Sequence, residues 1–119
     1  MPHILLVEDY EPVLHAISET LAAEGWQVEC CAHGLLALSK INSQEPYELL
    51  VSDNELSGIS GLELTRQVRR LLHRKEMPVI VISASECGRE AREAGADEFL
   101  KKPEGMNALV ATISRLINA

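Results

Sequence analysis

Five short apolar segments, each followed by a segment with helical character, constrain the fold of this chain more than any other feature. The apolar segments are 3–8, 26–31, 47–52, 79–83 and 96–100. Uninterrupted apolar runs of this length are typical of strands covered on both faces. Regular strand–helix alternation with short connections gives a parallel sheet with helices on both faces. We therefore predict an α/β fold with five parallel strands, and 119 residues fit one domain.

Four of the helical segments carry large apolar residues spaced three and four positions apart. The fourth helical segment, 85–94, has few such residues and contains Gly88, so a short helix is predicted there. Leu36 lies nearly opposite Leu38 at about 100° per residue and is expected to be exposed. The apolar residues that define the other helices are Val13, Leu14, Ile17 and Leu21; Leu35, Leu38 and Ile41; Leu64, Val68 and Leu71; and Met106, Leu109, Val110, Ile113, Leu116 and Ile117.

Polar residues collect where the predicted strands end. The first strand ends in Glu8 and Asp9, the third is followed by Asp53, the fourth ends in Ser83, and the fifth runs into Lys102. Ligands of open α/β sheets bind outside the carboxyl ends of the strands, where the strand order reverses. We therefore expect three carboxylates, a hydroxyl and an ammonium group to meet at one rim.

This combination favours phosphoryl-transfer chemistry. Crowded carboxylates repel one another unless a cation lies among them. Hard oxygen ligands of this kind suit Mg²⁺, which also accepts phosphate oxygens. A carboxylate beside the metal can act as a nucleophile toward phosphorus, and a lysine and a serine can stabilise the phosphoryl oxygens.

The chain resembles the receiver domain of two-component response regulators over essentially its whole length. This resemblance implies a flavodoxin-like (βα)5 fold with strand order 2-1-3-4-5, and a single receiver domain over 1–119. It rests on Glu8-Asp9 after ILLV, on Asp53 with Leu56 and Gly61, on Ser83-Ala84 after VIVI, and on GADEFLKKP at 95–103.

The resemblance assigns the phosphorylation site and the metal ligands. Asp53 would accept a phosphoryl group from a phosphohistidine on a histidine kinase or histidine phosphotransferase. Asp9 and Asp53 would bind Mg²⁺ directly, Glu8 through water, and Glu55 through its backbone carbonyl oxygen. The domain would be a signalling switch rather than an enzyme, with slow self-dephosphorylation at most.

The resemblance also assigns a switch. Ser83 would be the hydroxyl that moves toward the phosphoryl group, Phe99 would swing inward with it, and Lys102 would pair with the phosphate. The bond before Pro103 is expected to be cis, a state that only proline makes readily accessible. Phosphorylation would then act on an output domain or a downstream protein.

Two features depart from the family pattern. Ser57 stands where the family commonly has proline, so the loop after Asp53 is expected to be less rigid. Between Ser83 and Lys102 the chain is about three residues shorter than usual, close to one helical turn, and the loss falls in 85–94. In the family, the face formed by the fourth helix, fifth strand and fifth helix often carries dimerisation or output. A homodimer of that familiar kind is therefore in doubt.

The charge of the chain argues against direct binding of nucleic acid. Eleven Lys and Arg residues stand against 18 Asp and Glu residues, for a net charge of −7, whereas binding to a phosphate backbone needs a basic surface. A basic run in the third helical region is therefore interpreted as a solvated helix face: Arg66, Arg69, Arg70, Arg74 and Lys75.

Cysteine usage favours a cytoplasmic location. Adjacent Cys30 and Cys31 point to opposite faces of a strand, and the odd count of three has no framework spacing. We expect Cys30, Cys31 and Cys87 to be reduced packing residues. No segment approaches the roughly 18 apolar residues of a membrane span. The opening MPHILLVED has no basic region, so no signal peptide and no membrane contact are expected.

Several alternatives remain open from the residues alone. An isolated Asp53 would more often be a turn former, and Lys101 is as simple a candidate cation as Lys102. The chain could also be a degenerate receiver that binds partners without phosphorylation. A magnesium-dependent phosphatase, with Glu55 as a second acid two residues after Asp53, is a third and weaker interpretation.

Overall fold

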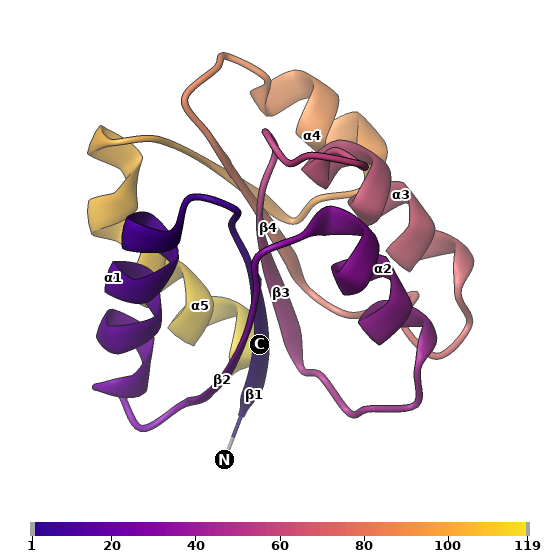
Figure 1. The fold of residues 1–119 in the computed structure, drawn as a ribbon, viewed down its shortest axis with the longest axis horizontal. Coiled ribbons are helices and arrows are strands. Elements are labelled where there is room, and N and C mark those ends of the chain that lie inside the picture. Colours follow the sequence, from indigo (N-terminus) through magenta and orange to yellow (C-terminus); the bar gives the residue numbers. More distant parts are fainter. Residues whose placement is uncertain (1, 119) are drawn as a thin grey trace.

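One parallel sheet organises the residues that the computed structural model describes, 2–118 (Figure 1). Its strand order is β2-β1-β3-β4-β5, which confirms the predicted α/β fold and the order 2-1-3-4-5. The elements are β1 (His3–Val7), α1 (Glu11–Ala22), β2 (Gln27–Cys31), α2 (Gly34–Asn42), β3 (Leu49–Asp53), α3 (Gly61–Arg70), β4 (Val79–Ser83), α4 (Gly88–Ala94), β5 (Glu98–Lys101), the 3-10 helix η1 (Glu104–Ala108) and α5 (Leu109–Ile117).

Helices cover both faces of the sheet, as Figure 1 shows: α1 and α5 lie on one side and α2, α3 and α4 on the other. Successive strand residues point to opposite faces. In β1, Ile4 and Leu6 therefore pack in the core on the α1–α5 side, while Leu5 and Val7 pack in the second core. All residues of β3 and β4 are buried, so these strands have continuous apolar runs rather than an alternating pattern.

β4 spans the predicted residues, and the bounds of the other four strands differ from the predicted ones by one or two residues. β3 extends to Asp53, so this residue is the last of the strand rather than the first of the loop. Glu8 lies just beyond β1, yet its N–H still donates to the Cys31 carbonyl oxygen at 3.1 Å. β5 begins at Glu98, because the Asp97 carboxylate turns back to accept the Val79 N–H at 2.8 Å. α4 has seven residues, which confirms a short fourth helix.

One of the three apolar residues that mark the second helix lies outside the core, while Ile41 is buried and Leu38 is partly buried against it. Leu35 is 60% exposed, so its inward placement is wrong, whereas Leu36 is 48% exposed as expected. The reason is that the start of α2 packs against the loop after β3. A Cβ at Gly34 would lie 2.7 Å from the Ile59 carbonyl oxygen, so glycine alone fits there. Leu35 is left beside Gly58, outside the core.

Arg74 contradicts the interpretation of the basic run as a solvated face. It is 3% exposed. Its guanidinium group donates to the carbonyl oxygens of Ile41 and Ser43, both at 2.9 Å, at the C-terminal end of α2. The same group lies over the Tyr47 ring, 5.0 Å from its centroid. The side chain therefore satisfies helix-end carbonyl groups that would otherwise lack donors.

Arg69 has a similar structural use. It donates to the carbonyl oxygens of Gly95 at 2.9 Å and Met77 at 2.8 Å, and pairs with the Asp97 carboxylate at 2.9 Å. These contacts join α3, which carries Arg69, to the segment before β4 and to the segment between α4 and β5. Two of the five basic residues thus serve the fold rather than the solvent-facing surface.

The cysteines are free, but they do not share one environment. Cys31 is buried in the core, Cys87 is half-buried and Cys30 is exposed, so the expected packing role is wrong for Cys30. β2 is an edge strand with only one fully buried residue, which explains this exposure. Among the described residues, no helix is long and apolar enough to cross a membrane.

We expect Arg74→Ala to lower the free energy of unfolding by about 2–3 kcal/mol, because buried carbonyl groups lose a charged donor. Arg70→Ala is the matched control, since the Arg70 side chain is 65% exposed and its ion pair with Glu63 is long, 3.8 Å. Urea denaturation of both variants measures the difference. Equal losses in the two variants would contradict the structural role of Arg74.

Candidate functional site

The carboxyl ends of four neighbouring strands bring the predicted site residues to one rim. β1 pairs with β3, β3 with β4, and β4 with β5, all parallel. Glu8 and Asp9 follow β1, Asp53 ends β3, Ser83 ends β4 and Lys102 follows β5. The chain reverses its direction of winding between β1 and β3, which is where such sheets bind ligands.

Three carboxylates form the acidic part of this rim. Glu8, Asp9 and Asp53 each offer an oxygen atom within 4.8 Å of the others. Glu8 and Asp53 are 1% and 2% exposed, while Asp9 is open to solvent. The Asp9 carboxylate accepts the Ser57 N–H at 3.3 Å, which fixes it toward the loop after β3. Like charges at this spacing repel one another strongly unless cations lie among them.

Lys102 is the cation that faces the buried carboxylates. Its Nζ lies 3.1 Å from Glu8 Oε1 and 3.1 Å from Asp53 Oδ1. Lys101 instead pairs with Glu86 at 2.7 Å, so it does not replace Lys102 at the rim. One ammonium group among three carboxylates leaves the cluster short of positive charge.

Asp53 is destabilised in its charged form. Burial raises the pKa of Asp53 to about 6, and the charges of Glu8 and Glu55 add to this shift while Lys102 opposes it. Asp53 Oδ1 is buried, and although Lys102 faces it, no hydrogen bond from the described residues reaches it. A buried carboxylate oxygen without a donor, beside two further carboxylates, matches the hard oxygen donors that Mg²⁺ prefers. The residues present therefore fit this metal.

The Glu55 side chain reaches the site, which the sequence did not predict. Ser83 Oγ donates to the Glu55 carboxylate, 2.7 Å from one oxygen and 2.9 Å from the other. The resemblance assigned a role only to the Glu55 carbonyl oxygen, and the phosphatase alternative used its side chain as an acid rather than as a partner of Ser83. The chain bends at Asn54, directly after β3, so strand periodicity gave no signal for the direction of the Glu55 side chain.

Phe99 and Pro103 complete the predicted set. The Phe99 ring is half-buried and packs beside the start of α4, where a Cβ on Gly88 would lie 3.2 Å from a ring carbon. The Lys102–Pro103 bond is cis, as expected.

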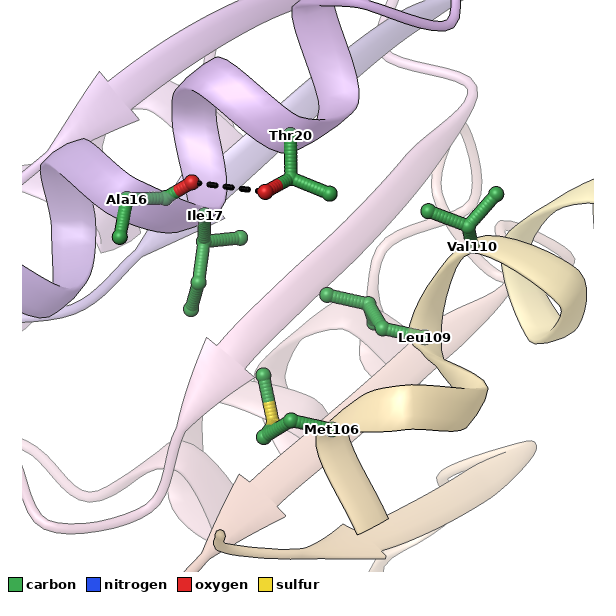
Figure 2. A pocket seen from close by; sticks show the side chains of 6 residues that line it. All are labelled: Ala16, Ile17, Thr20, Met106, Leu109 and Val110. Carbon is green, nitrogen blue, oxygen red and sulfur yellow. Dashed lines mark hydrogen bonds between the residues drawn. The ribbon is translucent and has the colours of Figure 1, made fainter. Parts of the chain in front are cut away.

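A separate hollow lies between α1 and the η1–α5 segment (Figure 2), and none of its lining residues belongs to the acidic rim. Its volume is about 140 Å³. The Thr20 hydroxyl donates to the Ala16 carbonyl oxygen at 3.0 Å, so the one side-chain hydroxyl there is already engaged. The hollow therefore offers apolar surface without titratable groups. Its lining residues are Ala16, Ile17, Thr20, Met106, Leu109 and Val110.

Comparison with known proteins agrees with this geometry. The family model described as the response regulator receiver domain matches residues 4–114. The phosphate regulon transcriptional regulatory protein PhoB of Rhizobium meliloti is 30% identical over 98% of this chain, and the chain spans 52% of that protein's length. The chain thus covers about half of this curated relative.

Two solved structures with bound magnesium share the fold. Response regulator TrrA from Thermotoga maritima, in complex with Mg²⁺ and BeF, has a TM-score of 0.86 and 30% identity, covering 98% of this chain and 99% of its own. The receiver domain of sensor histidine kinase PA1611 from Pseudomonas aeruginosa has a magnesium ion in its active-site cleft. Its TM-score is 0.88 at 27% identity, with coverage of 99% and 98%.

The raised pKa of Asp53 predicts a stability gain in Asp53→Asn when metal is absent. The folded-state value of about 6 lies above the unfolded value of about 3.9. Folding therefore favours the protonated acid, and wild-type stability is lost as pH rises from about 4 to about 6. At pH 7 we expect the variant to be more stable by up to about 3 kcal/mol.

Urea denaturation in the presence of a chelator, repeated across this pH range, tests the expectation. The difference between wild type and Asp53→Asn should shrink toward pH 4, because wild-type Asp53 becomes neutral there. Added Mg²⁺ should stabilise wild type more than the variant. Parallel pH profiles for the two proteins would contradict the assignment of the titration to Asp53.

Proposed function

Because this chain belongs to the family of response regulator receiver domains, we propose that it accepts a phosphoryl group on Asp53 and thereby switches an output domain or partner protein. Receiver domains are parts of signalling proteins rather than metabolic enzymes, and they interact with histidine kinases and output domains. The observation that carries the proposal is the buried Asp53 carboxylate, which shares the Lys102 ammonium group with Glu8 and is short of compensating charge.

We propose that the donor is a phosphohistidine on a histidine kinase or histidine phosphotransferase. A carboxylate oxygen of Asp53 attacks the phosphorus atom, and the P–N bond to the histidine breaks. The imidazole leaves with the bonding electrons and takes up a proton, while Asp53 becomes an acyl phosphate. Lys102 lies where it can neutralise charge on the phosphoryl oxygens.

Receiver domains bind Mg²⁺ at this acidic position. In this chain Glu8, Asp9, Asp53 and the Glu55 carbonyl oxygen would hold it. When bound, Mg²⁺ supplies charge neutralisation and orients the phosphoryl oxygens. The charges of the site support Mg²⁺ binding. Lys102 neutralises only part of the negative charge, because three carboxylates face a single ammonium group.

The switch is proposed to involve Ser83 and Phe99. Ser83 Oγ lies at the end of β4, beside the strand that ends in Asp53. Phe99 packs against Gly88 at the start of the short α4. A movement of the ring would therefore change the packing of that helix. We also propose that residues 1–119 work as one receiver unit in the cytoplasm, in line with the three free cysteines.

Incubation with acetyl phosphate and Mg²⁺ should add one phosphoryl group, about 80 Da, to the wild-type protein. Intact-mass spectrometry measures the gain, which should be absent in Asp53→Asn because an amide is a poor nucleophile. Glu19→Gln is the matched control, since it removes one negative charge from the exposed face of α1 and should be phosphorylated normally.

An unchanged wild-type mass at saturating Mg²⁺ would overturn the proposal. Partner binding that is indifferent to Asp53→Asn and to Mg²⁺ would instead favour a receiver used as a phosphorylation-independent interaction module.

A further inference from the structure

The Ser83 hydroxyl is already committed to a partner before any phosphoryl group arrives. Ser83 is fully buried at the end of β4, and its Oγ donates to the Glu55 carboxylate at 2.7 and 2.9 Å. The same oxygen accepts the Ser85 N–H at 3.0 Å. The three groups form a chain of hydrogen bonds: the Ser85 N–H donates to the Ser83 hydroxyl, which donates to the Glu55 carboxylate.

A hydroxyl has one proton to donate. While Ser83 donates it to Glu55, it has none for an oxygen atom on Asp53. A carboxylate and a phosphoryl group are both anionic acceptors, and hydrogen bonds to charged acceptors are the strong ones. Glu55 therefore competes for the same proton that a phosphorylated Asp53 would need.

Glu55 is held in place but is free to leave. Its carboxylate also accepts from Asn54 Nδ2 at 3.2 Å. Asn54 is fixed in turn, because its Oδ1 accepts the Leu62 N–H at 3.0 Å and its own N–H donates to the Ile82 carbonyl oxygen at 2.8 Å. Glu55 is itself solvent-exposed, so its side chain can turn into water without burying its charge.

We propose that the Glu55 side chain is a positioning residue that retains the Ser83 hydroxyl in the resting protein and has to be displaced before that hydroxyl can bind a phosphoryl group on Asp53. This inference rests on the proposed function for the second step, but the resting contact stands on the structure alone. Glu55 thus opposes the switch: it raises the free energy of the phosphorylated arrangement relative to the resting one.

The resting contact can be tested without metal or phosphodonor. A double-mutant cycle of Glu55→Ala and Ser83→Ala, measured by urea unfolding with a chelator present, should give a coupling of about fivefold in the folding equilibrium constant. Glu55→Gln should keep much of that coupling, because its amide oxygen still accepts from the hydroxyl without carrying a charge.

The displacement can be tested with beryllofluoride, which stands in for the phosphoryl group, titrated calorimetrically into protein saturated with Mg²⁺. Glu55→Ala should increase the affinity, and this increase should be about fivefold larger with Ser83 present than in the Ser83→Ala background. Loss of the Glu55 charge changes the affinity for beryllofluoride in both backgrounds, so this effect cancels in the ratio of the two affinity increases. Glu86→Ala, which removes an exposed negative charge that does not contact Ser83, is the control and should give a ratio near one.

Coupling in both experiments supports the proposal. A metal-free coupling within twofold of unity overturns the resting contact. Metal-free coupling together with a beryllofluoride ratio near one overturns the displacement, because Glu55 would then only stabilise the fold. A wild-type protein that binds no beryllofluoride overturns the proposed function and the displacement with it, and the metal-free cycle separates that failure from a failure of the contact itself.

Discussion

The interaction on which the site depends is the contact of the Lys102 ammonium group with Glu8 and Asp53, at 3.1 Å from each. It joins the ends of β1, β3 and β5, and Lys102 and Glu8 are 94 positions apart in the sequence. Removing Lys102 would leave two buried carboxylates without their cation, which is strongly destabilising. The contact nevertheless leaves Asp53 Oδ1 without a hydrogen bond. The same crowding therefore costs the resting protein stability, and a cation bound among these carboxylates would relieve it.

The elements beside this rim are anchored unevenly. β3 and β4 are buried throughout, so the residues at their ends, Asp53 and Ser83, are fixed by the sheet. α4 buries only Ala91 and Ala94, which give it little apolar area. Segments with few buried apolar contacts open at low free energy cost. The short α4, with Gly88 against Phe99, is thus the neighbouring helix best suited to respond when the site changes.

Sequence patterns predicted the sheet, its strand count and the residues at its rim, because the periodicity of strands and helices and the geometry of parallel sheets are local rules. Placements that depend on distant partners were not accessible. Arg74 is buried against carbonyl groups at the end of α2, more than thirty positions away. Leu35 is exposed because the start of α2 packs against the loop after β3. Glu55 reaches Ser83 across 28 positions. The structure brings the predicted rim residues together, but the functional roles assigned to them remain predictions. These residues are Glu8, Asp9, Asp53, Glu55, Ser83, Phe99 and Lys102.

Ser57 links the loop after Asp53 to the acidic rim. The family commonly has proline at this position, and the substitution alone predicts a looser loop after Asp53. In the structure the Ser57 N–H donates to the Asp9 carboxylate at 3.3 Å. Proline has no N–H and could not make this bond. The departure from the family pattern therefore exchanges a restriction on the backbone for a hydrogen bond to an acidic residue of the rim, and the position of the loop becomes linked to Asp9. A cation that draws on the Asp9 carboxylate would weaken its hold on Ser57, which couples occupancy of the site to the loop that carries Glu55.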